Sequence, residues 1–127
     1  MKWVLKGKKN HKSNSFKCAF SGLFNSFKSE KHLIIHFIFA ILVITAGFIL
    51  KVSNIEWCIL VLTICLVISL ELVNTAIEHT VDLAMPEIHP IAKLAKDISA
   101  AAVLFSAIGS VVIGIIIFLP KLLEFIK

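Results

Sequence analysis

Residues 57–83 read WCILVLTICLVISLELVNTAIEHTVDL, and this stretch decides the fold. Its first half is apolar enough to begin a membrane-spanning helix, and its second half continues the same helical spacing of apolar residues. The second half also carries Glu71, Asn74, Glu78 and Asp82. A carboxylate at the centre of a membrane helix costs roughly 2.5–3.5 kcal/mol on insertion scales, so this repeated placement indicates a functional site.

The composition of the whole chain agrees with a membrane location. Of its 127 residues, 58% are hydrophobic, and a soluble domain of this kind would lack enough polar surface to cover its core. The basic residues are 13 Lys and no Arg, and eight of them precede residue 32, beside the first apolar run. This clustering favours contact with an anionic membrane surface over binding to nucleic acid.

The predicted fold is all-α, with one surface helix and three spans. Phenylalanines and other apolar residues from Ser15 onward recur at i, i+3, i+4 and i+7, which predicts an amphipathic helix lying in the membrane interface. A soluble packing helix is the alternative, but the chain offers no soluble domain to receive it. We predict a basic flexible tail at 1–14, a single membrane domain at 15–127, the surface helix at about 15–29, and spans at about 33–50, 57–78 and 98–119.

The connections between the spans are also predicted from composition. Residues 51–56 are expected to form a short turn, and the polar segment from 79 to 97 to form a loop or broken helix around Pro86 and Pro90. Pro120 is expected to end the third span.

Small residues recur at every fourth position of the third span. A ridge of this kind lets helix backbones approach closely, which predicts helix packing and self-association. The ridge consists of Ala102, Ser106, Ser110 and Gly114.

The lysines also predict the orientation. With the N-terminus inside the cell, ten Lys are cytoplasmic and three, Lys51, Lys121 and Lys127, are outside; the reverse orientation would give three against ten. The positive-inside rule therefore places the N-terminus in the cytoplasm. Six of the eight acidic residues then lie at the cytoplasmic edge of the membrane.

Helical geometry places the polar residues of the second span in one stripe. At about 100° per residue, Asn74, Glu78 and Asp82 lie within about 60° of Glu71, and Glu71 lies about 10 Å deeper than Glu78. A buried carboxyl group such as Glu71 suits a general base, whereas Glu78 at the membrane edge suits Mg²⁺.

Structural interpretations of the same residues remain open. Glu71 and Asn74 could be interhelical hydrogen-bonding groups, and Asp82 could cap a helix or solvate the loop. His32 and His36 lie one turn apart, but packing or an interfacial position explains them better than metal binding. The sequence contains no P-loop, Rossmann fingerprint, CxxC, HExxH or nucleophile elbow, so any nucleotide chemistry would rest on Lys and carboxylate-bound Mg²⁺.

Two motifs resemble the prokaryotic diacylglycerol kinase family. The first is SLELVNTAIEHTVDL at 69–83, and the second is AKDISAAAV at 95–103. The likeness covers about residues 15 to 120, and the details EHTVDL, IEW at 55–57 and FLPKLL at 118–123 are similar to the Gram-positive branch, whose members phosphorylate undecaprenol.

The resemblance implies specific roles. Glu71 matches the glutamate proposed to take the proton from the lipid hydroxyl, and Glu78 matches a carboxylate that binds the metal with ATP, with Glu30 as its partner. It also implies a homotrimer whose site is shared between subunits. The positions that match nucleotide-binding or site-lining groups are Asn74, Lys96, Asp97, Glu87 and His89.

One departure from the family pattern concerns the start of the first span. Family members often read ERN there, whereas this chain reads EKH at 30–32. The metal role of Glu30 is unaffected, but an amide contact from the third position is not available.

The resulting hypothesis is a membrane lipid kinase that transfers the γ-phosphoryl group of MgATP to undecaprenol. Diacylglycerol is the alternative substrate. The rival functions from other classes are a small transporter or proton-relay protein that uses Glu71 as its ion-carrying carboxylate, and a structural membrane subunit.

Overall fold

The computed structural model describes residues 15–127, and the predicted tail at 1–14 lies outside these described residues. The described residues form helices and short connections only. The helices are α2 (Ser15–Ser29), α3 (Lys31–Ile49), α4 (Asn54–Ala84) and α5 (Pro90–Ile126).

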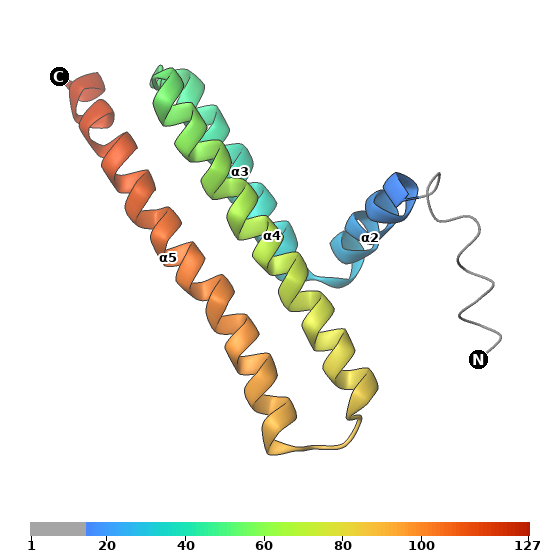
Figure 1. The fold of residues 1–127 in the computed structure, drawn as a ribbon. Coiled ribbons are helices and arrows are strands. Elements are labelled where there is room, and N and C mark those ends of the chain that lie inside the picture. Colours follow the sequence, from blue (N-terminus) through green and yellow to red (C-terminus); the bar gives the residue numbers. More distant parts are fainter. Residues whose placement is uncertain (1–14) are drawn as a thin grey trace.

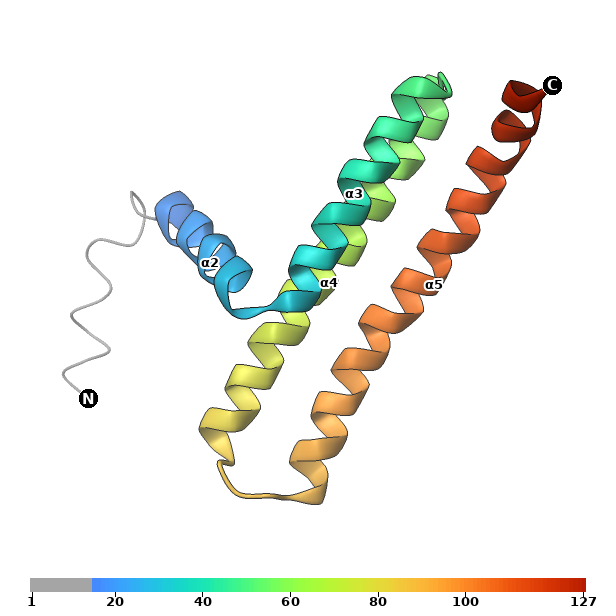
Figure 2. The ribbon, with the colours of Figure 1, turned by 180° about the vertical axis from the view of Figure 1, so that it is seen from behind.

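Three of these helices form the membrane-spanning part of the chain. α3, α4 and α5 are each long and apolar enough to cross a bilayer. α3 lies against α4, and α5 returns along α4 from the loop that joins them (Figure 1; Figure 2 gives the opposite view). The predicted all-α membrane protein with an N-terminal helix and three spans is confirmed, and the chain is a multi-pass membrane protein.

The first described helix has the amphipathic character that its sequence predicted. None of its residues is buried, and Phe16, Phe20 and Phe24 are exposed. The ring of Phe27 lies 4.3 Å, centroid to centroid, from that of Phe37, which ties the end of α2 to α3. An apolar face left uncovered beside three spans suits a helix that lies in the membrane interface.

The turn between the first two spans is shorter than predicted. α4 begins at Asn54 because Ser53 caps it: the Ser53 hydroxyl accepts from the Glu56 N–H at 3.3 Å, and the Ser53 N–H donates to Glu56 Oε2 at 2.7 Å. This reciprocal capping box satisfies two backbone donors. Lys51, with φ of 52°, provides the left-handed turn residue.

The segment from 79 to 97 was predicted to be a loop or a broken helix, and it is a helix broken at residues 85–89. α4 continues to Ala84 and α5 begins at Pro90, so only residues 85–89 are non-helical. Pro90 stands in the first turn of α5, where its missing N–H leaves no helical bond unmade. His89 caps this helix, with Nδ1 accepting from the Ile91 N–H at 3.2 Å.

Pro120 does not end the third span, contrary to prediction. α5 continues through it to Ile126. A proline removes one helical hydrogen bond, which membrane helices tolerate where neighbouring groups compensate locally. Here the next residue, Lys121, reaches Glu56 of α4 at 3.1 Å and holds the end of α5 against the start of α4.

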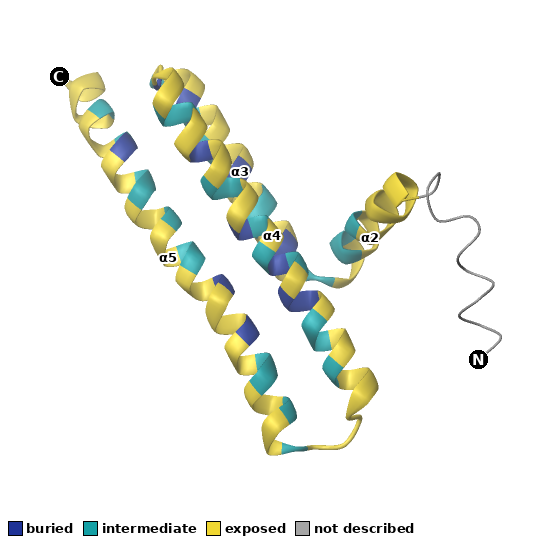
Figure 3. Cartoon of the chain, in the orientation of Figure 1, coloured by how far each residue is buried: buried dark blue, intermediate teal, exposed yellow. Residues whose placement is uncertain are grey.

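Apolar packing is concentrated at this end of the bundle. Val52, Leu60 and Ile117 form a buried cluster, and Trp57 packs against it. Gly47 of α3 is required there, because a Cβ atom would lie only 2.6 Å from the Trp57 ring. Elsewhere most apolar residues of the spans are exposed (Figure 3), which suits contact with lipid or with other copies of the chain.

The small-residue ridge of α5 is loosely packed within one chain. Ser106, Ser110 and Gly114 are half-buried and Ala102 is exposed. A Cβ atom at Gly114 would meet nothing within 4 Å. Self-association through this ridge therefore stays a prediction.

Candidate active site

The polar stripe of α4 is graded in burial. Glu71, Asn74 and Thr75 are buried, at 5%, 9% and 6% exposure. Glu78 is half-buried and Asp82 is exposed. These residues share a face because positions three and four apart line up on a helix, and the burial decreases from Glu71 toward the loop.

Asn74 connects α4 to α5 and to Glu78. Its Oδ1 accepts a hydrogen bond of 2.6 Å from the hydroxyl of Ser99, which is itself buried. Its Nδ2 donates to Glu78 Oε1 at 3.2 Å. The interhelical interpretation of Asn74 is therefore correct, and the same amide also holds the orientation of one of the predicted metal ligands.

His36 lies beside Glu71. Its Nε2 is 3.9 Å from Glu71 Oε2, and the Glu71 side chain is 6% exposed. The packing interpretation of His36 missed this neighbour. The signal was available, because His36 is the one ionisable side chain between Leu33 and Leu50, and such residues mark functional sites in membrane helices.

A cavity of about 350 Å³ lies in front of these groups. α3 and α4 give it a polar wall, and α5 gives it a wall of small and aliphatic side chains. His32 is part of the polar wall. The lining residues are His32, His36, Glu71, Asn74, Glu78, Ala100, Val103, Leu104 and Ala107.

The predicted nucleotide-binding residues gather mainly in a second cavity, of about 280 Å³, beside the α4–α5 loop. Glu87, His89 and Lys96 line it, and Lys96 Nζ lies 2.5 Å from Asp82 Oδ1. This ion pair with Lys96 supports the interpretation of Asp82 as a structural residue. Asp97 pairs with Lys93 at 2.6 Å and is not among the described residues that line this cavity.

Glu30 is not among the described residues that line either cavity. It is the extended residue between α2 and α3, with φ of −112° and ψ of 107°, and its side chain makes no capping hydrogen bond. Among residues 15–127 there is no group of three or more His, Cys, Asp or Glu that could hold a metal ion. Glu78 and Glu30 offer carboxylate oxygens of the kind that Mg²⁺ takes one or two at a time, with phosphate and water completing its shell.

The model of the prokaryotic diacylglycerol kinase family matches residues 17–118. The chain belongs to this family. The match covers α3 and α4 in full, most of α2 and α5, and every predicted site residue, from Glu30 to Asp97.

Similar curated proteins carry two kinds of name. The undecaprenol kinase of Bacillus subtilis (strain 168) is 47% identical over 108 residues, covering 85% of this chain and 88% of that protein. The diacylglycerol kinase of Synechocystis sp. is 42% identical over 87% of this chain and 63% of that protein. That of Haemophilus influenzae is 34% identical over 85% of this chain and 93% of that protein.

Membership in the prokaryotic diacylglycerol kinase family identifies the enzyme class. The chain is a lipid kinase, and ATP is the phosphoryl donor that such a reaction requires. The transporter and structural-subunit interpretations are therefore set aside.

Proposed function

We propose that this lipid kinase transfers the γ-phosphoryl group of ATP to the hydroxyl group of undecaprenol. The observation that carries the proposal is the buried Glu71 carboxylate, which faces a polar cavity from within an apolar span. The 47% identity to a protein named undecaprenol kinase supports this lipid as the acceptor. Diacylglycerol is the second candidate, because other relatives are named for it.

In the proposed reaction, Glu71 is the catalytic residue. It accepts the proton of the lipid hydroxyl group as the oxygen attacks the γ-phosphorus and ADP leaves. Phosphoryl transfer depends mainly on positioning and on electrostatic stabilisation of the phosphates. A cavity open between spans lets the lipid hydroxyl reach Glu71 without its hydrocarbon leaving the bilayer.

We assign the metal to Glu30 and Glu78. Mg²⁺, when bound, neutralises charge on the phosphate oxygens. The hydrogen bond from Asn74 to Glu78 leaves the second oxygen of that carboxylate for the ion. Glu30 is close in sequence to His32, which lines the Glu71 cavity.

The nucleotide is assigned to the α4–α5 junction. Lys96 exchanges Asp82 for a phosphate oxygen, since a lysine ammonium binds either anion as a point charge. Asn74, Asp97, Glu87 and His89 complete the proposed nucleotide contacts. In this arrangement the nucleotide extends from the loop cavity toward Asn74 and Glu78, so that its phosphates meet the lipid hydroxyl group in the Glu71 cavity.

The proposed setting is the cell membrane, with the N-terminus and the active site on the cytoplasmic side, where ATP is available. The lysine distribution supports this orientation. We also propose a homotrimer with sites shared between subunits, which would cover part of the exposed apolar surface of the spans.

The decisive experiment compares the two lipids directly. Purified protein in mixed micelles is given radiolabelled ATP, Mg²⁺ and either undecaprenol or diacylglycerol, and kcat/KM is measured for each. We expect a higher value for undecaprenol. A higher value for diacylglycerol would reject the acceptor, and activity that survives complete removal of Mg²⁺ would reject the metal assignment.

A further inference from the structure

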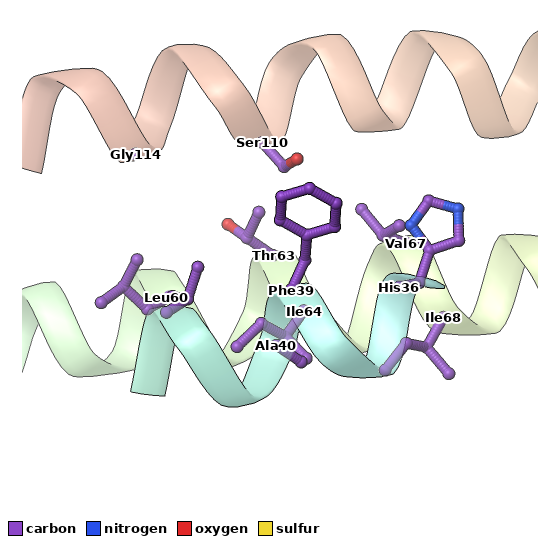
Figure 4. A pocket seen from close by; sticks show the side chains of 11 residues that line it. His36, Phe39, Ala40, Leu60, Thr63, Ile64, Val67, Ile68, Ser110 and Gly114 are labelled. Atoms are coloured by element: carbon purple, nitrogen blue, oxygen red, sulfur yellow. The ribbon is translucent and has the colours of Figure 1, made fainter. Parts of the chain in front are cut away.

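A smaller apolar cleft lies between α3, α4 and α5, with a volume of about 90 Å³ (Figure 4). Phe39 of α3 and Thr63 of α4 point toward Ser110 of α5 across it. Leu60 and Gly114 line its deeper part. Hydrocarbon side chains make up most of the remaining lining.

This cleft adjoins the Glu71 cavity. His36 lines both, so it stands at the mouth of the cleft. Along α4, the lining extends from Ile68 to Leu60, which lies roughly 4 to 16 Å from Glu71 along the helix axis. The cleft therefore leads from Glu71 into the apolar half of the spans.

The hydroxyl groups that line the cleft already donate hydrogen bonds to backbone carbonyl groups of their own helices. The Thr63 hydroxyl donates to the Ile59 carbonyl and the Ser110 hydroxyl to the Ala107 carbonyl, each at 2.7 Å. Beyond His36, the described side chains that line the cleft offer no other N–H or O–H group. An ester carbonyl placed there would lose its hydrogen bonds to water without replacement, whereas a hydrocarbon chain loses none.

We propose that this cleft holds the hydrocarbon segment next to the reacting hydroxyl group, and that it favours a single-chain isoprenoid alcohol over a glycerol diester. The inference rests on the proposed function. In a prenol the hydrocarbon begins at the carbon that bears the hydroxyl group, whereas in diacylglycerol two ester groups lie within a few bonds of it. A cavity of about 150 Å³ holds benzene, so about 90 Å³ suits roughly one five-carbon isoprene unit.

Gly114 gives a direct test. A Cβ atom there meets nothing within 4 Å, so Gly114→Leu begins without a clash and places its further carbons in the cleft that Gly114 lines. The matched control is Gly109→Leu. Gly109 is on the same helix, is exposed, and has the same free space around a Cβ atom, but it is not among the residues that line the cleft.

Both full-length variants are purified and assayed with prenols of 15 and 55 carbons and with diacylglycerol. For Gly114→Leu we expect kcat/KM, relative to wild type, to fall about tenfold for the two prenols, which place their first isoprene unit in the cleft, and much less for diacylglycerol, which does not. Gly109→Leu should match wild type throughout. A loss that is equal for the prenols and diacylglycerol, or no loss with the 55-carbon alcohol, would overturn the proposal.

Two further results separate the possible failures. A changed oligomeric mass of Gly114→Leu in detergent, measured by light scattering, with equal losses on all alcohols, would mean that another copy of the chain occupies the cleft. A wild-type enzyme that phosphorylates diacylglycerol but no prenol would defeat the proposed function itself. An enzyme that phosphorylates undecaprenol and is unaffected by Gly114→Leu would defeat only the cleft.

Discussion

The two ends of the helical bundle differ in how closely their side chains pack and in how polar those side chains are. At the end near Trp57, apolar side chains fill the space between helices so closely that Gly47 has no room for a Cβ atom. At the end near Glu71, the helices leave cavities of about 350 and 280 Å³, and charged or amide groups line them. Close packing stabilises a fold, whereas polar cavities in a membrane domain are retained for binding and chemistry.

Polar groups also behave differently at the two ends. Near Trp57 they pair with one another at the edge of the spans. Ser53 is hydrogen-bonded to Glu56, and Glu56 forms an ion pair with Lys121. Near Glu71 they lie between helices, with His36 and Asn74 at the wall of a cavity. Substitutions at the Trp57 end should therefore change stability, and substitutions at the Glu71 end should change activity.

The largest effect is expected at Glu71. Glu71→Gln keeps the shape of the side chain but removes the group that accepts the proton. Loss of general base catalysis should lower kcat by roughly 10²–10⁴-fold, while the midpoint of thermal unfolding in detergent does not fall. Radiolabel transfer to undecaprenol and a melting curve measure the two quantities.

Glu124→Gln is the matched control for this change. It removes a carboxylate from an exposed position near the far end of α5. Its kinase activity should equal that of wild type. If Glu71→Gln retained full activity, Glu71 would not be the base, and the functional contrast between the two ends would fail.

Gly47→Ala should have the opposite effect to Glu71→Gln: it should lower stability and leave kcat unchanged. The added Cβ would lie 2.6 Å from the nearest carbon of Trp57, and overpacking of this kind lowers the free energy of unfolding by about 1–3 kcal/mol. The folded enzyme should keep its kcat, because the clash lies at the Trp57 end. Denaturant unfolding in mixed micelles and activity per folded protein give the comparison.

Gly109→Ala isolates the clash from the helix propensity of alanine. Both variants gain about 1 kcal/mol or less from replacing glycine in a helix, but only at Gly47 does the new atom meet a ring. Equal stability of the two variants would show that the packing against Trp57 is not tight.

Much of this architecture could be predicted from local sequence. Apolar periodicity predicted the surface helix, long apolar runs predicted the three spans, and the 100° spacing of α4 placed Glu71, Asn74 and Glu78 on one face. The predictions from sequence were least accurate where contacts with residues distant in the sequence, rather than local composition, determine the structure. The charged segment before and after the loop remains helical, with Asp82 paired to Lys96, which is 14 residues away.

The missed site residues have the same explanation. His36 and Ser99 lie 35 and 25 residues from the groups that they contact, Glu71 and Asn74. Periodicity assigns a side chain to a face of its own helix but does not determine which face of the next helix it meets. Only the packing of α3 and α5 against α4 brought these partners together.

Ser99→Ala should have a moderate effect on both stability and binding. It removes the 2.6 Å hydrogen bond to Asn74, and such interhelical bonds in membranes contribute about 0.6 kcal/mol on average and up to about 1.7. Because Asn74 also donates to Glu78, we expect the KM for MgATP to rise several-fold with a smaller change in kcat. Steady-state kinetics separate the two.

Two variants test whether this effect depends on the bond to Asn74. Ser99→Thr keeps a hydroxyl donor and should restore the KM. Ser106→Ala removes a hydroxyl that donates to the Val103 carbonyl of its own helix, at 2.8 Å, and should leave the KM unchanged. A KM that rises equally in both alanine variants would mean that Ser99 has no specific role at the site.

The smallest effect is expected for Lys121→Gln, which removes the ion pair with Glu56. The two side chains are 26% and 25% exposed, and partly exposed pairs of this kind contribute about 0–1 kcal/mol. The free energy of unfolding should fall within that range, the difference from wild type should shrink at high salt, and kcat and KM should stay unchanged. Lys127→Gln, at the exposed end of the chain, provides the charge-matched control. A loss of kinase activity in Lys121→Gln alone would show that the closure of α5 on α4 near Trp57 is transmitted to the Glu71 cavity, and that the two ends are coupled rather than separate.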